Sequence, residues 1–335
     1  AFKQKTFSAR FPGFKNDEGE FMQMVIDKTN VEPHFVYPSD KTLLEQIEKV
    51  AYYQDEPFGG ASILVQYEVM KLAKDNDVTV LLDGQGTDEI LGGYHWYFNI
   101  FFNHLKSTNK ETFKKEFAAY KNLHQNNTVN ATQKINAKSY LRQLLAGKMH
   151  SIQKTQQWLQ QKINKPFNKD FFSAYSADLF KTEFPFLNNL NTALRYSTMG
   201  GDLQILLRYA DRNSMASSRE VRLPFLSHEV VEFLFSLPAE YKIHEGWTKW
   251  IMRKSFSDIL PEKICWRTDK IGYEPPQKQW MEKPEIKDRI IESRKKLVGA
   301  GILDKRVLNK EPKGNSATET GDKSWEHLMA GYLIQ

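Results

Sequence analysis

The stretch VTVLLDGQGTDEILGGYHWY, residues Val78 to Tyr97, joins a run of β-prone apolar residues to an acidic, glycine-rich segment. The apolar run over 78–82 is typical of a strand in a parallel sheet, which is buried on both faces. Packing alone does not require acidic residues and glycines directly after such a strand. Because ligands of open parallel sheets bind beyond the carboxyl ends of the strands, we expect a ligand site from Asp83 onward.

The segments before this strand alternate between strand and helix patterns. β-prone runs predict strands at Lys5–Phe11, His34–Pro38 and Val78–Leu82. Helical periodicity fills the intervals, where Asp17 with Glu20 resembles a capping box for the first helix and Ser39 or Asp40 is expected to cap the second. The order strand, helix, strand, helix, helix, strand predicts an α/β fold with a parallel sheet.

After Tyr97 the sequence changes in character. Residues 106–185 are rich in Asn, Lys, Gln and aromatic side chains, and they show helical periodicity without a convincing strand. We expect this segment to form helices that cover the sheet. From about residue 186 the pattern stays helical, with an exposed loop at 309–323 and a closing amphipathic helix.

The bulk composition argues against several classes of protein. Lys and Arg number 47 and Asp and Glu 41, so the formal charge is 47 − 41 = +6, spread along the chain, and we expect no nucleic-acid partner. Cys265 is the only cysteine, which excludes an intrachain disulfide and a cysteine-cluster zinc site and indicates a reducing compartment, the cytoplasm. No apolar run approaches the ~18 residues of a membrane-spanning helix, so no membrane partner is expected.

The glycines and acids after the strand favour a ligand site. Gly84 and Gly86 can adopt backbone angles forbidden to other residues, and they let backbone N–H groups approach a ligand closely. Asp83, Asp88 and Glu89 bring three acids to one strand end, and carboxylates crowded beside a phosphate site suggest a divalent metal such as Mg²⁺. The alternative is a tight turn whose acids only offset a helix dipole, and the glycines alone do not separate the two interpretations.

Two later segments carry charge in unexpected places. Arg208–Leu226 packs four arginines and two acids into a region expected to be helical, which taken alone favours a structural ion-pair network. Cys265–Pro276 is a proline-bounded loop with Lys270 before Gly272. A lysine on such a loop can neutralise phosphate charge, and the alternative is an ordinary surface lysine.

Together, these three segments resemble the synthetase domain of the glutamine-hydrolysing asparagine synthetase family. The family string Ser-Gly-Glu-Gly-x-Asp-Glu-x-x-Gly-Gly-Tyr is matched by Asp83–Tyr94. The string Asp-Arg-x-Ser-Met-Ala…Glu-x-Arg-x-Pro-Phe-Leu is matched by Asp211–Ala216 and Glu220–Leu226, and Trp-Arg-x-x-Lys-x-Gly-Phe/Tyr by Trp266–Tyr273. The resemblance follows the chain in order, apart from a divergent stretch near 106–185.

The resemblance implies an α/β fold with a parallel sheet of the adenine-nucleotide α-hydrolase-like type and large helical additions. The expected parts are the remainder of the nucleotide-binding α/β core at 1–105, a helical insertion at 106–185, and a helical C-terminal part that completes the synthetase site at 186–335. The implied reaction uses ATP and Mg²⁺ to adenylate the side-chain carboxylate of aspartate, releasing pyrophosphate. Ammonia from a glutaminase domain outside this chain then displaces AMP to give asparagine, and a homodimer is left open.

The resemblance also assigns roles to single residues. It implies nucleotide contacts for the strand backbone at Ala9 and for Asp83 and Gly84. It matches Asp88 to a Mg²⁺ ligand and Lys270 to the lysine that stabilises pyrophosphate and transition-state charge. That last role is physically reasonable, because negative charge builds on the leaving group.

Candidate substrate contacts and a possible change of base complete the expected site. By resemblance, Asp211 and Arg222 are the candidate substrate contacts. Gln85 stands where the family has a glutamate thought to act as general base on the attacking amine, and a neutral amide cannot accept a proton usefully. Asp83 replaces the usual serine, and it could supply the carboxylate if strand geometry persists, because alternate strand residues share a face.

The family's phosphate loop, Ser-Gly-Gly-x-Asp-Ser, and its glutaminase domain are not found in this sequence. We therefore expect a fragment of a longer synthetase that does not turn over ATP at a normal rate by itself. Two alternatives stay open. One is a related amidotransferase or amide ligase that acts on another carboxylate, and the other is a non-catalytic remnant that serves as a binding domain.

Overall fold

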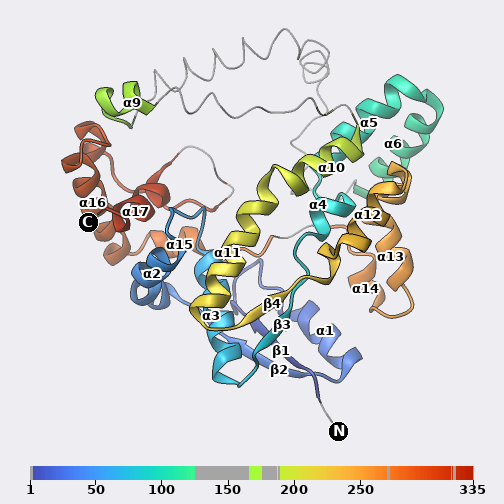
Figure 1. Ribbon diagram of the computed structural model, residues 1–335, viewed down its shortest axis with the longest axis horizontal. Helices are drawn as coiled ribbons and strands as arrows, with labels where there is room; N and C mark the ends of the chain where they lie inside the picture. The colour runs from blue at the N-terminus through green and yellow to red at the C-terminus, as the bar shows by residue number, and fades with distance from the viewer. Residues whose placement is uncertain are drawn as a thin grey trace.

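The computed structural model describes residues 3–124, 166–175, 187, 189–269, 272–317, 319 and 322–334. Helices predominate and the strands are short (Figure 1). The strands are β1 (Lys5–Ala9), β2 (Glu32–Val36), β3 (Val80–Leu82), β4 (Glu220–Arg222), β5 (Ile243–His244) and β6 (Trp247–Thr248). The α-helices are α1 (Gly19–Thr29), α2 (Asp40–Gln54), α3 (Ser62–Asp75), α4 (Thr87–Leu91), α5 (Trp96–Thr108), α6 (Lys110–His124), α9 (Lys169–Tyr175), α10 (Leu190–Met199), α11 (Asp202–Ala216), α12 (His228–Ser236), α13 (Trp250–Phe256), α14 (Glu262–Cys265), α15 (Gln277–Met281), α16 (Pro284–Gly299) and α17 (Ser324–Tyr332). Short 3₁₀ turns are η2 (Pro224–Leu226), η3 (Ala239–Tyr241) and η4 (Lys305–Asn309).

The expected parallel strands form two pairs instead of one sheet in the described part of the chain. β1 pairs in parallel with β2, and β3 pairs in parallel with β4, each as a two-stranded sheet. The start of β1 lies near the loop before β3, because Lys5 Nζ donates to the carbonyl oxygen of Asn76 at 3.1 Å. The fold is therefore α/β and mostly helical, with small parallel sheets.

Burial of the strand before the glycine-rich segment differs from the prediction. The run Val78–Leu82 was expected to be buried on both faces, yet Val80 is 38% exposed and Leu82 is 72% exposed. Val80 and Leu82 are alternate residues of β3, so both side chains lie on the same face of the β3–β4 pair, and that face is exposed. The strand is also shorter than the apolar run, because it begins only at Val80.

β4 was missed by the sequence analysis, which expected helix throughout Arg208–Leu226. α11 ends at Ala216, and Ser218 then adopts a left-handed conformation with φ 55°. That residue turns the chain, so that Glu220 N–H donates to the carbonyl oxygen of Thr79 at 2.9 Å and the strand begins. A three-residue strand is too short to show an alternating pattern.

The helix caps were predicted correctly at one of two places. Ser39 caps α2, accepting a hydrogen bond from Thr42 N–H while the Thr42 hydroxyl accepts one from Ser39 N–H. The capping box expected from Asp17 and Glu20 was wrong, because α1 has Glu18 at its N-cap position and no side-chain cap. Asp17 instead accepts from Arg10 at 2.8 Å and from Phe11 N–H at 2.8 Å.

Two large hydrophobic clusters lie in different parts of the molecule. One joins the end of β1 to α2, α3 and α15–α17, where Trp325 is 1% exposed and donates its indole N–H to the carbonyl oxygen of Phe58 at 2.8 Å. The other joins α5, α6, α10 and β5, and its aromatic rings fix α6 against α5. Figure 1 shows α16 and α17 at one side and α5, α6, α12 and α13 at the other. None of the helices in the described ranges is both long and apolar enough to cross a membrane.

Candidate functional site

A cavity of about 360 Å³ is lined by segments far apart in the sequence. They are the residue before α1, α4 with the loop after it, the end of α6, the β5–β6 hairpin with α13, and α14 with the loop that follows. The charged side chains of the lining are Glu18, Asp88, Lys249, Arg253, Arg267 and Asp269. Three of these are acidic and three are basic, so the cavity can hold both charged and polar groups.

Asp88 reaches the cavity because two glycines let the chain pass closely. Gly86 has φ 93°, and a Cβ there would lie 2.3 Å from Leu226 Cδ2, so the turn from β3 into α4 requires glycine. At Gly93 a Cβ would lie 1.7 Å from Asp88 Oδ1. These close approaches are made to the chain's own side chains, and the approach of backbone N–H groups to a ligand stays a prediction.

α4 is fixed by a second acidic residue. Glu89 is 2% exposed and accepts a hydrogen bond from the Tyr94 hydroxyl at 2.6 Å. Burial, followed by this hydrogen bond to Glu89, raises the pKa of Tyr94 well above its usual value, so the hydroxyl stays protonated and donates. Glu89 therefore has a structural role beside Asp88.

Lys249 is the partner of Asp88. Its Nζ lies 2.9 Å from Asp88 Oδ1, and the two side chains are 22% and 17% exposed. Lys249 follows β6 directly and adopts a left-handed conformation with φ 53° and ψ 36°. A non-glycine residue in this conformation stores strain, and such residues gather at functional sites.

Arg253 lies one helical turn beyond Lys249. Its Nε donates to the carbonyl oxygen of Thr248 at 2.7 Å, its Nη1 donates to that of Cys265, and its guanidinium lies over the Trp247 ring, 5.0 Å from the centroid. Burial lowers the pKa of Arg253 from its usual value. Two backbone carbonyl oxygens and the face of the Trp247 ring hold this guanidinium in place. It lines the cavity, where its positive charge would attract an anion.

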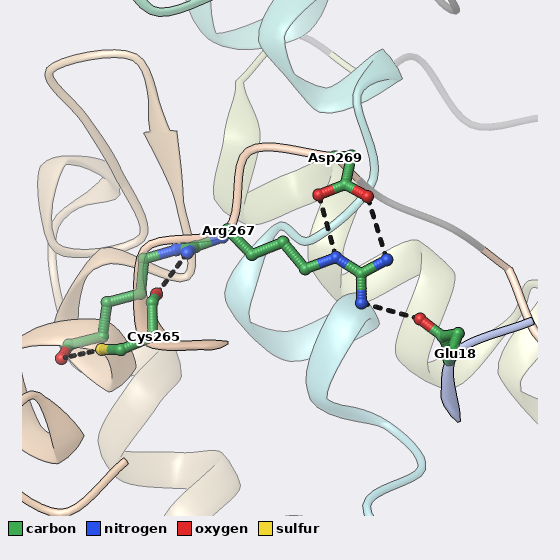
Figure 2. A network of polar contacts seen from close by, with 5 residues as sticks. Glu18, Cys265, Arg267 and Asp269 are labelled. Atoms are coloured by element: carbon green, nitrogen blue, oxygen red, sulfur yellow. Dashed lines mark hydrogen bonds and ion pairs between the residues drawn. The ribbon is translucent and has the colours of Figure 1, made fainter. Parts of the chain in front are cut away.

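Arg267 joins the loop after α14 to the start of α1. Figure 2 shows its guanidinium between Asp269, with two contacts of 2.9 Å, and Glu18, with one of 2.7 Å. The hydrogen bond from Arg267 is the main cause that lowers the pKa of Asp269. The same figure shows Cys265, whose carbonyl oxygen and thiol both contact Arg253. Lys270 and Ile271 lie outside the described residues, but Thr268 and Asp269 line the cavity together with Asp88.

Comparison with known proteins shows the family of the chain. Residues 2–334 match the family described as asparagine synthase. The chain belongs to the asparagine synthase family. It is 26% identical over 284 residues to asparagine synthetase [glutamine-hydrolyzing] 1 of Bacillus subtilis (strain 168), an alignment that covers 83% of this chain and 43% of that protein.

Two further relatives extend the comparison. Asparagine synthetase [glutamine-hydrolyzing] 3 of the same organism is 26% identical over 322 residues, covering 90% of this chain and 44% of its own length. Asparagine synthetase [glutamine-hydrolyzing] of Gallus gallus is 44% identical over 61 residues, covering 17% of this chain and 11% of its own length. This member of the asparagine synthase family thus spans less than half the length of the Bacillus relatives that it matches.

The residues expected to contact the nucleotide lie at strand ends and not in the described cavity lining. Ala9 ends β1 and is 2% exposed, while Asp83 and Gly84 follow β3 directly. Asp83 N–H donates to the carbonyl oxygen of Arg222 at 3.0 Å, which ties the loop to the end of β4. Gln85 is half-buried beside them. All of these positions stand at the carboxyl ends of parallel strands, where nucleotides bind in such folds.

The two candidate substrate residues lie apart from the cavity lining. Asp211 is exposed on α11, and its carbonyl oxygen accepts from the Ser214 hydroxyl. Arg222 is exposed at the end of β4, where it pairs with Glu220 at 2.6 Å. Their proposed contact with substrate stays a prediction.

A complete Mg²⁺ site is not formed by the residues that the structure describes. Within those residues no three His, Cys, Asp or Glu side chains gather in a way that could hold a metal ion. Asp88 Oδ1 is paired with Lys249, so a metal ion at this carboxylate would be held through Oδ2 or would compete with the lysine. Asp88 can therefore be one ligand at most, and we derive no chemical step through a metal.

Several cavity residues were missed by the sequence analysis. The sequence analysis singled out none of His95, His124, Lys249 and Arg253, yet all four line the cavity. The usable signal was the string His-Glu-Gly-Trp-Thr-Lys, in which a Glu-Gly pair between two short β-prone runs indicates a hairpin. The two cations that follow at a spacing of four lie on one helical face.

Proposed function

We propose that the protein containing this chain is an ATP-dependent amide ligase of amino-acid biosynthesis, and that the chain is its synthetase part. The proposed reaction adenylates the side-chain carboxylate of aspartate, and ammonia from glutamine then gives asparagine. Membership of the asparagine synthase family supports the proposal, because the relatives bear the name asparagine synthetase. The partners would be small molecules, with a glutaminase domain outside this chain as the source of ammonia.

The proposed chemistry has two steps. A carboxylate oxygen of aspartate attacks the α-phosphorus of ATP, and the bond to the bridging β-phosphate oxygen breaks, so that pyrophosphate leaves. Ammonia then attacks the acyl carbon, loses a proton, and AMP leaves as the carbon–oxygen bond breaks. Negative charge accumulates on pyrophosphate in the first step, and fixed cations placed beside it lower the barrier.

We propose that cations of the described cavity serve this chemistry. Lys249 and Arg253 line the cavity, and we assign Lys270 to the same group because Thr268 and Asp269 line it too. The observation that carries the proposal is that the turn bearing Asp88 and the loop that leads into Lys270 share one cavity.

Nucleotide binding is assigned to a neighbouring part of the site. Ala9, Asp83 and Gly84 would hold ATP, because they stand at the carboxyl ends of β1 and β3. A Cβ added at Gly84 would meet no atom within 4 Å, so the backbone there is open to a ligand. Asp83 would orient the nucleotide or act as the base that Gln85 cannot be.

The proposal is tested by pyrophosphate release from ATP and aspartate with the full-length gene product. Lys270→Ala is expected to slow release by about 10²-fold, because one donor to developing charge is lost. Lys263→Ala is the matched control, since Lys263 is exposed on α14. Equal rates for the two variants would remove Lys270 from the chemistry. Failure of the wild-type protein to bind ATP would favour a non-catalytic binding domain.

A second candidate function is an amide ligase that acts on a carboxylate other than aspartate. Gln85 favours it, because the family pattern places a glutamate where this chain has an amide. That position meets the attacking amine, so its change alters the second step most directly. A panel of acceptor carboxylates in the pyrophosphate assay separates the two candidates. Release that depends on aspartate alone would exclude the second.

A further inference from the structure

The β5–β6 hairpin delivers residues to the cavity through an unusually strained turn. Glu245 has φ 48° and Gly246 has φ 77°, so both central residues of this two-residue turn are left-handed. Such turns prefer Asn-Gly, because a left-handed backbone conformation costs more free energy for a glutamate than for an asparagine. Lys249, only three residues after Gly246, is left-handed as well. A hairpin of two-residue strands cannot hold this conformation alone, so its surroundings must do so.

A buried carboxylate on α6 contacts this turn. Glu116 is 2% exposed, and its Oε1 lies 3.1 Å from His244 Nδ1. Burial raises the pKa of Glu116, while His244 and the backbone N–H groups of Glu245 and Gly246, the two left-handed residues, act in the opposite direction and favour the charged carboxylate. Burial is costly for a carboxylate, and the imidazole of His244 at 3.1 Å offsets part of that cost.

Two more residues on the same face of α6 contact the turn. His124 Nε2 donates to the carbonyl oxygen of Gly246 at 3.0 Å. A Cβ at Gly246 would lie 2.7 Å from Tyr120 Cα, so the turn packs directly on the helix backbone. Glu116, Tyr120 and His124 are spaced by four and form one stripe of α6, which we call the clasp.

The turn held by the clasp is connected to Lys249 and Arg253 of the cavity by a short segment of backbone. The hairpin passes from Gly246 through Trp247 and Thr248 to Lys249, whose Nζ lies 2.9 Å from Asp88. The carbonyl oxygen of Thr248 accepts from Arg253 Nε at 2.7 Å. A shift of the turn would therefore move both Lys249 and Arg253.

We propose that Glu116 is a positioning residue of this site, which holds the Glu245–Gly246 turn and thereby sets Lys249 and Arg253 in the cavity. The role of the two cations in this inference rests on the proposed function. The contact between Glu116 and the hairpin does not depend on that function. Part of the helical insertion thus belongs to the site. A residue needed only for packing would not have to be a carboxylate, because an apolar side chain fills such a space at lower cost.

The first test measures the hairpin directly in the 335-residue chain. Hydrogen–deuterium exchange of peptides covering residues 243–249 is compared among wild type, Glu116→Gln and Glu111→Gln. Glu111 is the matched control because it is an exposed glutamate of α6. Glu116→Gln is expected to raise exchange at 243–249 by about tenfold, the cost of one charged hydrogen bond, and to leave α10 and α16 unchanged. Unchanged exchange at 243–249 would overturn the inference.

A rescue variant separates positioning from general stability. Glu245→Asn supplies the residue that a two-residue turn prefers, so Glu116→Gln with Glu245→Asn is expected to regain protection at 243–249. Titration calorimetry with inorganic pyrophosphate should show affinity lowered about tenfold in Glu116→Gln and restored in the double variant. If the double variant exchanges as fast as the single one, the turn is not what Glu116 holds, and the inference fails.

If the proposed function is wrong and the positioning role of Glu116 is right, these experiments give a different result. Wild-type protein that shows local protection of 243–249 but no pyrophosphate affinity would count against the proposed function and leave the hold of Glu116 on the hairpin intact. A uniform rise of exchange across α5, α6 and α10 in Glu116→Gln would show that Glu116 serves only the aromatic core.

Discussion

At the scale of single residues, Asp88 and Lys249 show what a sequence can and cannot reveal. Asp88 was expected at a ligand site, because it follows a strand and two glycines, and the structure places it on the cavity. Its partner is distant in the sequence, and an ion pair between remote residues leaves no local pattern. The need for glycine at position 93 is also visible only in three dimensions, because a Cβ there would clash with the carboxylate of Asp88.

Lys249→Met is expected to lower the free energy of unfolding by about 1–2 kcal/mol, because it leaves the partly buried carboxylate of Asp88 without its cation. Urea denaturation followed by circular dichroism measures the change. Adding Asp88→Asn should restore part of the loss, since both charges are then absent. Additive losses in the double variant would show that the two side chains do not interact in solution.

At the scale of elements, patterns of four or more residues were predicted well and shorter ones were not. α2, α3 and α17 have clear apolar faces, and they form where periodicity placed them. β4 was missed because three residues carry no period, and its place is set by pairing with β3. The cap expected from Asp17 failed because Arg10 and Phe11 compete for the same carboxylate.

The cap of α2 gives a test at this scale. Ser39→Ala removes the acceptor of the Thr42 N–H, and we expect a loss of about 1 kcal/mol in the free energy of unfolding. Ser39→Asp keeps an acceptor for the Thr42 N–H, and its negative charge interacts favourably with the helix dipole. This variant should therefore retain most of the stability. Thermal denaturation of the three proteins ranks them. Equal midpoints for Ser39→Ala and wild type would mean that solvent satisfies this N–H equally well.

At the scale of the whole molecule, the sequence indicated the α/β class and not how the strands assemble. Strands β1 to β3 arise near their expected positions, but in the described part of the chain β1 pairs with β2, and β3 pairs with β4, as two separate sheets. Which strands pair depends on contacts between remote segments, such as that of Lys5 with Asn76. The periodicity within one strand does not predict such contacts. The division at residues 105 and 185 likewise stays a prediction.

The C-terminal helices give the molecule an acid-sensitive point. His327 on α17 is 8% exposed, and its Nδ1 accepts from Arg294 Nε at 3.3 Å. Burial and then the nearby Arg294 charge lower the pKa of His327 to about 4 from its usual 6.5. Protonation would break this hydrogen bond and place two cations together between α16 and α17.

The sign of the resulting pH dependence follows from that lowered pKa. The unfolded chain binds a proton at His327 below about pH 6.5 and the folded chain only below about pH 4, so stability is fully present above 6.5 and is lost as the pH falls toward 4. The loss should reach about 3 kcal/mol at most. His327→Asn keeps an acceptor for Arg294 and does not titrate, so the difference in unfolding free energy between variant and wild type should grow in favour of the variant from pH 6.5 to 4. A difference that stays constant over this range would mean that His327 has the same pKa in both states.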